Sequence, residues 1–88
     1  MDKAIHSAAQ DALCRLLREH RRRAGLRQVD VAARLDEPQS FVSKYESGER
    51  RLDLVEVRQI CVALDVPFLA LMAEFEHSTA GAGRPSRH

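Results

Sequence analysis

The stretch "PQSFVSKYESGERR", residues 38–51, is long enough for one short helix but holds few residues that could enter a core. Only Val42 and Tyr45, three positions apart, are spaced to anchor one edge of such a helix. The other side chains are mostly polar, and hydrogen-bonding groups stand at Gln39, Ser40, Ser43, Lys44 and Ser47. The pattern therefore predicts a helix whose outer surface makes contacts, followed by a glycine and the basic pair Arg50 and Arg51.

A second short helix is expected immediately before this one, over Gln28–Leu35, with Val31 and Ala32 facing inward. Only residues 36–38 connect the two helices, so they must cross at close range. The small side chain of Ala32 suits such a crossing. Two helices joined by so short a turn form a helix-turn-helix unit.

The outer face of the second helix in this unit suits double-stranded DNA. A major groove admits one α-helix, where Gln bonds adenine, Lys bonds guanine and Ser bonds several base edges. Gln39 and Ser40 stand in the first turn, and Lys44 follows one turn later. Small hydroxyl groups also suit phosphates, which leaves Ser43 open to either role. From these residues alone, an ordinary solvated face is the alternative to DNA reading.

Three further helices complete an expected all-α, compact five-helix fold, since no stretch alternates as a half-buried strand would. The first spans residues 7–24 and ends before Gly25. The fourth begins after Asp53, which forms a capping-box pair with Glu56, and the fifth begins near Pro67. The positions expected to face inward are Leu13, Leu16, Leu17 and His20 in the first helix, Leu54, Val57, Ile60, Cys61 and Leu64 in the fourth, and Phe68, Leu71 and Phe75 in the fifth.

The length of 88 residues predicts one domain. We expect residues 1–10 to be an N-terminal extension that merges into the first helix, 11–76 to form the domain, and 77–88 to be a disordered tail. The first residues contain no apolar signal core, and the longest apolar run, residues 66–73, is too short to span a bilayer. We therefore expect an intracellular protein with no membrane partner.

The cysteines and histidines predict neither a disulfide nor a metal site. Cys14 and Cys61 follow no secretory signal, and the histidines have no metal-ligand spacing with them. Cys61 lies on a predicted core face, whereas Cys14 lies off the line of Leu13 and Leu17 and is expected to be partly exposed. Without a nucleophile–base pair, a metal set or a phosphate loop, the sequence indicates no enzyme and no cofactor.

Charge is unevenly distributed along the chain, although the formal net charge is only +1. Residues 1–51 carry 11 basic and 8 acidic side chains, whereas residues 52–76 carry one basic and five acidic. A basic front half suggests an anion-binding face. For Arg22 and Arg23 the sequence favours a solvated role at a helix C-terminus, where cations interact with the helix dipole.

Residues 17–72 resemble the lambdoid phage repressor and Cro family of helix-turn-helix domains, the xenobiotic-response-element type. The resemblance rests on "AGLRQ" (24–28), "VAARL" (31–35), "QSFVSKYESGERR" (39–51) and "LVEVRQICVALDVP" (54–67), in the family's order and spacing. It implies a five-helix, lambda-repressor-like domain whose third helix reads the major groove. It also implies a cytoplasmic protein, bacterial or phage-encoded, that associates with the nucleoid.

By matched position, the resemblance implies that Gln28 braces Gln39 and that Arg21 and Glu46 form a partly buried structural ion pair. The DNA-binding residues that it implies are Arg27, Gln28, Gln39, Ser40, Ser43, Lys44, Ser47, Arg50 and Arg51. Arg27 stands where the family has a capping Ser or Thr, which predicts the loss of a cap worth about 1 kcal/mol. The other departures from the family pattern are at the turns, at Asp36, Pro38 and Pro67.

The fifth helix carries more apolar residues than one small core can use. Leu69 and Met72 have no obvious partner within the chain, so we expect them to form a homodimer interface. The expected function is a homodimeric transcriptional repressor that reads a near-palindromic operator in double-stranded DNA. The alternative is an antitoxin or other interaction module that binds a different protein partner through this helix. A wide core stripe on a monomer is a third reading of the same residues.

Overall fold

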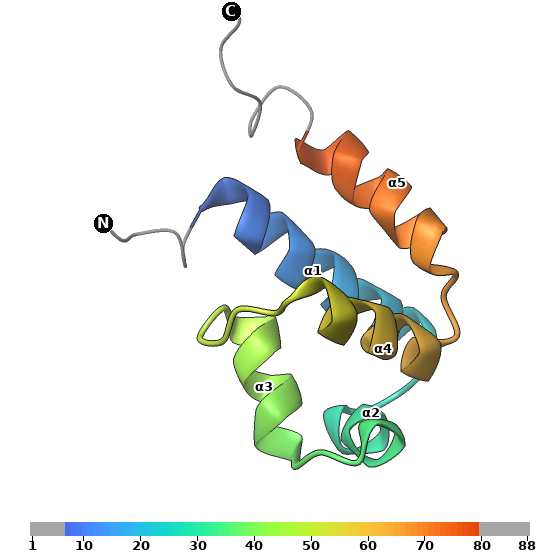
Figure 1. Ribbon diagram of the computed structural model, residues 1–88. Helices are drawn as coiled ribbons and strands as arrows, with labels where there is room; N and C mark the ends of the chain where they lie inside the picture. Colours follow the sequence, from blue (N-terminus) through green and yellow to red (C-terminus); the bar gives the residue numbers. More distant parts are fainter. Residues whose placement is uncertain (1–6, 80–88) are drawn as a thin grey trace, which may run out of the picture.

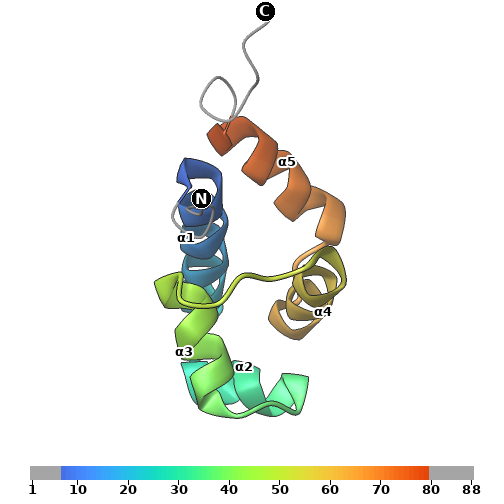
Figure 2. The ribbon, with the colours of Figure 1, turned by 60° about the vertical axis from the view of Figure 1, so that its left-hand side comes forward.

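The structure, a computed structural model, describes residues 7–79, which form five helices (Figure 1). The helices are α1 (Ala8–Arg23), α2 (Gln28–Leu35), α3 (Gln39–Ser47), α4 (Leu54–Leu64) and α5 (Phe68–Thr79). No strand occurs among the described residues, so the expected all-α class is confirmed. In both ribbon views α2 and α3 lie together at one end of the molecule, while α5 lies at the other end beside α1 (Figures 1 and 2).

Local capping groups set the beginnings of two helices. The Ser7 hydroxyl oxygen accepts the backbone N–H of Gln10 at 3.0 Å, which caps α1. At α4 the Asp53 carboxylate accepts the Glu56 N–H at 2.7 Å, and the Glu56 carboxylate accepts the Asp53 N–H at 2.9 Å. This reciprocal pair is the predicted capping box, and each bond satisfies an amide that the helix itself leaves unpaired.

Two aspartates end α2 and α4 in the left-handed conformation. Asp36 has φ of 57° and Asp65 has φ of 59°. The N–H of the residue that follows each aspartate bonds back across the helix end, from Glu37 to the Ala32 carbonyl and from Val66 to the Cys61 carbonyl, each at 2.9 Å. Asp tolerates this conformation better than most residues. Asp36 therefore makes the tight turn between α2 and α3 without a glycine.

Apolar side chains from all five helices meet in one core. The largest fully buried side chains are Leu17, Val31, Val42, Tyr45, Ile60, Cys61 and Leu71. Helix α3 contributes only Val42 and Tyr45 to this set, and burial of each stabilises the fold by about 1.5–3 kcal/mol. Anchored by these two residues, α3 packs on α1 and α2 with its other faces outward.

Two expectations about burial in α1 and α4 were wrong. Leu54 is 64% exposed because it is the first residue of α4 and lies ahead of the turn that reaches the core. Cys14 is buried rather than partly exposed. Helix α1 packs against both α3 and α5, so its buried face is wider than the single stripe that periodicity predicts.

The predicted start of the tail was also wrong. Helix α5 continues through Thr79, whose hydroxyl donates to the Phe75 carbonyl at 2.8 Å, so residues 77–79 are helical. On its inner side α5 is fastened to α1 by His20, whose Nε2 lies 2.5 Å from a Glu74 carboxylate oxygen. The rest of the expected tail, and most of the expected N-terminal extension, lie outside the described residues.

Candidate nucleic-acid interface

The outer face of α3 carries the side chains that the sequence singled out. Gln39, Ser40, Lys44 and Ser47 are exposed, and Ser43 is half-buried. The structure therefore places all five on the surface of one helix whose inner edge is fixed in the core. Pro38 precedes the helix in an extended conformation and Gly48 ends it with φ of 88°.

A chain of hydrogen bonds runs from the first residue of α3 into the molecule. The Gln39 amide nitrogen donates to the Gln28 amide oxygen at 2.6 Å. The Gln28 nitrogen in turn donates to a Glu46 carboxylate oxygen at 3.0 Å. The brace expected between Gln28 and Gln39 is thus present, and it holds the Gln39 amide in one orientation at the outer edge of α3.

The buried end of this chain is the ion pair of Arg21 and Glu46. Arg21 Nε donates to one Glu46 oxygen at 2.6 Å and Nη2 donates to the other at 2.9 Å. The side chains expose only 12% and 4% of their surface, and Arg21 Nη1 also bonds the Leu26 carbonyl. The hydrogen bonds to Glu46 raise the pKa of Arg21. Two-pronged pairs of this kind are strong and fix geometry, so the pair ties α1 to the end of α3.

Helix α2 begins without the Ser or Thr cap of the family pattern, but hydrogen bonds between Arg27 and Asp30 hold its first turn. The backbone N–H of Arg27 donates to Asp30 Oδ2 at 2.7 Å, and the Arg27 guanidinium holds the same carboxylate at 2.9 and 3.1 Å. These bonds lower the pKa of Asp30 to about 2. The expected lost cap is therefore offset from within the first turn. The Arg27 side chain remains 77% exposed.

The loop after α3 is fastened by Arg50. Its guanidinium donates to both oxygens of Glu56, at 3.1 and 2.8 Å, and lies 4.8 Å from the centre of the Phe41 ring. The charge of Arg50 is therefore already partnered, which the sequence did not predict. Arg51 is exposed beside it. Ser47 donates its hydroxyl to the Lys44 carbonyl at 3.1 Å.

A notch of about 350 Å³ opens where α1, α2 and α3 meet. Its lining residues are Arg18, Arg21, Arg22, Gln28, Ser43, Glu46 and Ser47. Sequence analysis assigned no role in DNA binding to Arg18 or Arg22. Their spacing of four residues indicates from sequence alone that both lie on one face of α1. Only the fold shows that this face borders α3.

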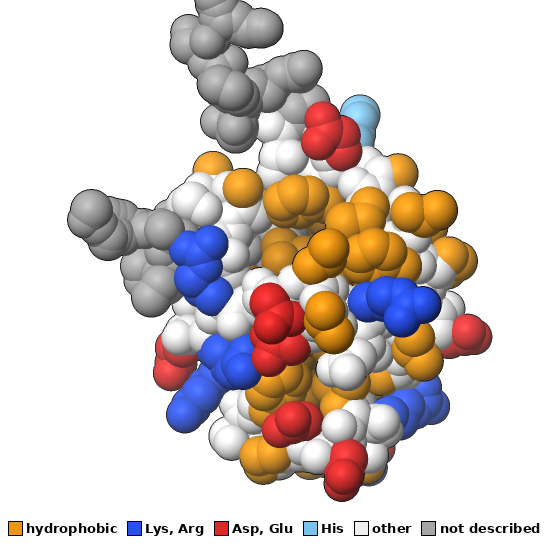
Figure 3. Space-filling view, in the orientation of Figure 1, with side chains coloured by type: hydrophobic (Ala, Val, Ile, Leu, Met, Phe, Trp, Pro, Cys, Tyr) orange, Lys and Arg blue, Asp and Glu red, His pale blue; other side chains and the backbone are white. Residues whose placement is uncertain are grey.

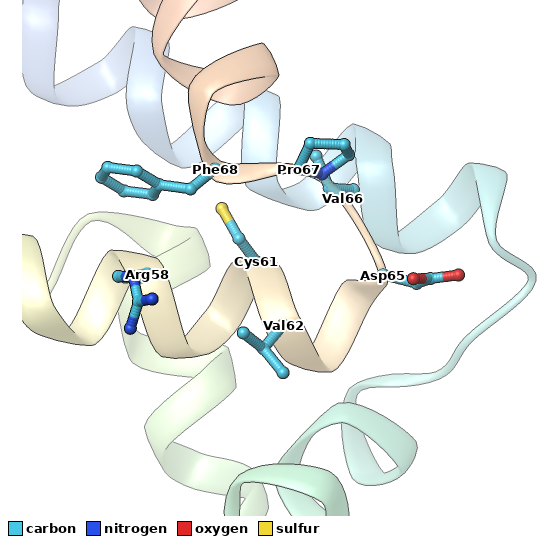
Figure 4. Close-up of a pocket in the computed structure, with 7 residues that line it drawn as sticks. All are labelled: Arg58, Cys61, Val62, Asp65, Val66, Pro67 and Phe68. Atoms are coloured by element: carbon cyan, nitrogen blue, oxygen red, sulfur yellow. The ribbon is translucent and has the colours of Figure 1, made fainter.

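Apolar side chains gather on a different part of the surface, over α4 and α5 (Figure 3). Leu69 is 78% exposed, and on α4 Val62 and Val55 are 74% and 65% exposed. Val62 also lines a shallow hollow of about 410 Å³ between α4 and the start of α5 (Figure 4). Met72, in contrast, is half-buried and packs against the core, so the expectation that it lacks a partner in the chain was wrong. The sequence missed Val55 and Val62.

Neither a metal centre nor a membrane segment was found in the part of the chain that the structure describes. Within residues 7–79 no cluster of His, Cys, Asp and Glu side chains could hold a metal ion. None of the five helices is both long and apolar enough to cross a bilayer.

Comparison with known proteins bears on both fold and family. A family model described as a helix-turn-helix domain matches residues 12–75. An XRE-family like protein from Pseudomonas syringae pv. tomato str. DC3000 is 47% identical, with 85% of this chain and 92% of that chain covered and a TM-score of 0.79. The restriction-modification controller protein C.AhdI from Aeromonas hydrophila is 31% identical, with 73% and 97% covered and a TM-score of 0.67.

A third solved structure shares the fold at lower identity. The restriction-modification controller protein C.Esp1396I, a tetramer in complex with its natural 35 base-pair operator, is 18% identical, with 83% of this chain and 96% of that chain covered and a TM-score of 0.77. The curated proteins gave no match.

Proposed function

The chain belongs to the helix-turn-helix domain family, within the XRE type of DNA-binding transcriptional regulators, and we propose that it is a homodimeric repressor that reads one operator sequence through α3. The observation that carries the proposal is the outer face of α3, where Gln28 holds Gln39 in place while Ser40 and Lys44 stay exposed. An amide that is already ordered loses little freedom on binding a base, which favours recognition in the major groove.

The polar residues on and beside α3 divide into two proposed roles. We assign base contacts to Gln39, Ser40 and Lys44, and backbone contacts to Arg27, Gln28, Ser43, Ser47 and Arg51. Ser43 goes with the backbone set because it lines the notch beside α1. Arg50 receives a positioning role, since Glu56 already holds its guanidinium. The Arg27 side chain is already exposed, so it could exchange its Asp30 partner for a phosphate without disturbing the core.

The apolar face of α4 and α5 supports a two-fold dimer. Leu69 and Val62 are the most exposed large apolar side chains among the described residues, and covering such surface contributes about 25 cal/mol per Å². A two-fold interface uses the same patch on both subunits. Because α5 lies at the opposite end of the molecule from α3, a contact through Leu69 leaves the reading helix free (Figure 1). The two α3 helices would then enter successive major grooves, about 34 Å apart.

Selection from a pool of random DNA duplexes tests the proposal. The purified chain should enrich a near-palindromic site with half-sites about one helical turn, or 10 base pairs, apart. A pool that stays random after repeated rounds would contradict base reading. An enriched single half-site would keep base reading but contradict the dimer.

Repression is tested separately in cells. A reporter promoter that overlaps the selected site should lose expression when the protein is present, because a bound dimer blocks other proteins from the same DNA. Increased expression would show activation instead.

The exposed apolar face also favours a second candidate, an interaction module that binds a different protein. Sedimentation of the purified chain separates the two functions. A dimer at micromolar concentration supports self-association through this face. A monomer that binds duplex DNA weakly and equally at all sequences would favour the interaction module.

A further inference from the structure

We propose that Arg18 and Arg22 of α1 hold a phosphate of the DNA backbone in the notch beside α3. This inference rests on the proposed DNA-binding function and adds two residues to it. The sequence favours a solvated role for Arg22 at the end of α1 and indicates none for Arg18. The distribution of ion pairs and the lining of the notch point to phosphate binding instead.

Most arginines around the reading helix are already partnered by carboxylates. Arg21 is held by Glu46, Arg23 by Glu19, Arg27 by Asp30 and Arg50 by Glu56. Arg34 donates to the Ala63 carbonyl at 2.7 Å. These side chains would have to exchange a partner before they could bind an anion.

Arg18 and Arg22 differ from these arginines. Neither forms an ion pair with any residue between 7 and 79, and both are exposed. A guanidinium without a partner keeps its planar set of donors available, and that set matches a phosphate.

The notch places these two arginines beside groups that also bind phosphates. They line it together with Gln28, the first residue of α2, and with Ser43 of α3. The N-terminus of α2 adds partial positive charge. Small hydroxyls and amides are common phosphate ligands.

One carboxylate, that of Glu46, also lines the notch. It is 4% exposed and accepts hydrogen bonds from Arg21 and Gln28, so its charge is neutralised within the protein. Glu46 therefore opposes an incoming anion only weakly, and Arg18 and Arg22 supply the uncompensated positive charge of the notch.

A helix-dipole role does not account for both residues. Cations stabilise a helix only within its last turn. Arg22 lies in the last turn of α1, but Arg18 lies about one turn earlier. A shared phosphate ligand explains why two arginines four residues apart, neither of them in an ion pair with a described residue, line the same notch.

The salt dependence of binding tests the inference. Anisotropy of a labelled duplex of random sequence, about two helical turns long, is measured between about 50 and 200 mM salt for the wild type and for Arg18→Gln, Arg22→Gln and the double variant. The double variant should flatten the slope of log K against log salt by about one unit, because one phosphate contact is lost, and each single variant should flatten it by part of that unit. Arg18→Lys and Arg22→Lys should keep the wild-type slope, since an ammonium also binds phosphate.

Arg23→Gln is the matched control. It removes the same charge one residue from Arg22, but Arg23 does not line the notch. If Arg18→Gln and Arg22→Gln give the same slope as Arg23→Gln, the inference is overturned while DNA binding stands. If the wild type binds no duplex, the proposed function fails as well. Thermal melting establishes whether each variant folds. If a glutamine variant does not fold, Arg18→Ala and Arg22→Ala allow the same comparison, because alanine favours the helix.

Discussion

At the scale of single residues, the orientation of Gln39 depends on groups that never touch DNA. Its amide is bonded to Gln28, which is bonded to Glu46, which is paired with Arg21. Networks of this kind fix one geometry because each member satisfies the next. The family resemblance predicted two parts of this hydrogen-bond network, the contact of Gln28 with Gln39 and the ion pair of Arg21 with Glu46. Only the fold shows that the Glu46 carboxylate accepts hydrogen bonds from both Arg21 and Gln28, which links the ion pair to the outer face of α3.

Arg21→Met should destabilise the fold by about 3 kcal/mol, because it leaves the Glu46 carboxylate buried without its cation. Arg22→Met and Arg23→Met remove the same charge from exposed positions and should change stability by less than about 0.5 kcal/mol. Denaturant unfolding of the three variants measures the difference. Equal midpoints for all three would show that the ion pair contributes nothing measurable.

Gln28→Ala should reduce base discrimination without a direct base contact, by freeing the Gln39 amide that Gln28 now holds. The expected loss is about 1 kcal/mol at the base that Gln39 reads. It is measured by comparing the selected site with single-base variants at that position. Arg51→Ala is the control, since loss of a phosphate contact should weaken binding to all these sites alike. A uniform loss for Gln28→Ala would contradict the bracing role.

At the scale of helices, the positions of caps and turns could be predicted because they depend on neighbours in sequence. The capping box of Asp53 and Glu56 is present at α4, and Asp36 ends α2 in the short connection expected over residues 36–38. Burial was less predictable because it depends on which helices meet. Periodicity could not show that α3 and α5 both cover α1, and so the expectation that Cys14 is partly exposed was wrong.

The first turn of α2 should respond to acid through Asp30. Its pKa is lowered from 3.8 to about 2 by bonds from Arg27, so the charged form is the one that caps the helix. The stabilisation is present above pH 4 and is lost as the pH falls through about 2. An NMR titration should show Asp30 and the Arg27 amide titrating together near pH 2, and Asp30→Asn should abolish that step in the amide. Titration of Asp30 near 3.8 would show that the bonds do not persist in solution.

At the scale of the whole molecule, the two candidate surfaces are separated. Helix α3 lies at one end, and α5, the helix that carries Leu69, lies at the other (Figure 2). The expectation that Leu69 lacks a packing partner agrees with its 78% exposure among residues 7–79. The expectation for Met72 was wrong because residues three apart on a helix, such as Leu69 and Met72, differ in burial when a neighbouring helix covers only one of them. The exposure of Val62 was not predicted.

Leu69→Glu should give a folded monomer, since Leu69 is exposed and contributes little to the core. Binding to a full operator should weaken at least tenfold, while binding to a half-site should not change. Met72→Glu should instead lower the melting temperature, because Met72 packs against the core. Sedimentation and thermal melting of the two variants separate the roles. A dimeric Leu69→Glu would place the interface elsewhere.

The central claim, that α3 reads bases, is tested most directly by Lys44→Ala measured against every single-base substitution of the selected site. Lys44 is exposed on α3, and its ammonium makes no ion pair with any described residue. The account predicts that discrimination falls by about 1–3 kcal/mol at one base pair per half-site and is unchanged at the others. If Lys44→Ala weakens binding equally at every sequence, Lys44 contacts only the backbone, and the claim is contradicted.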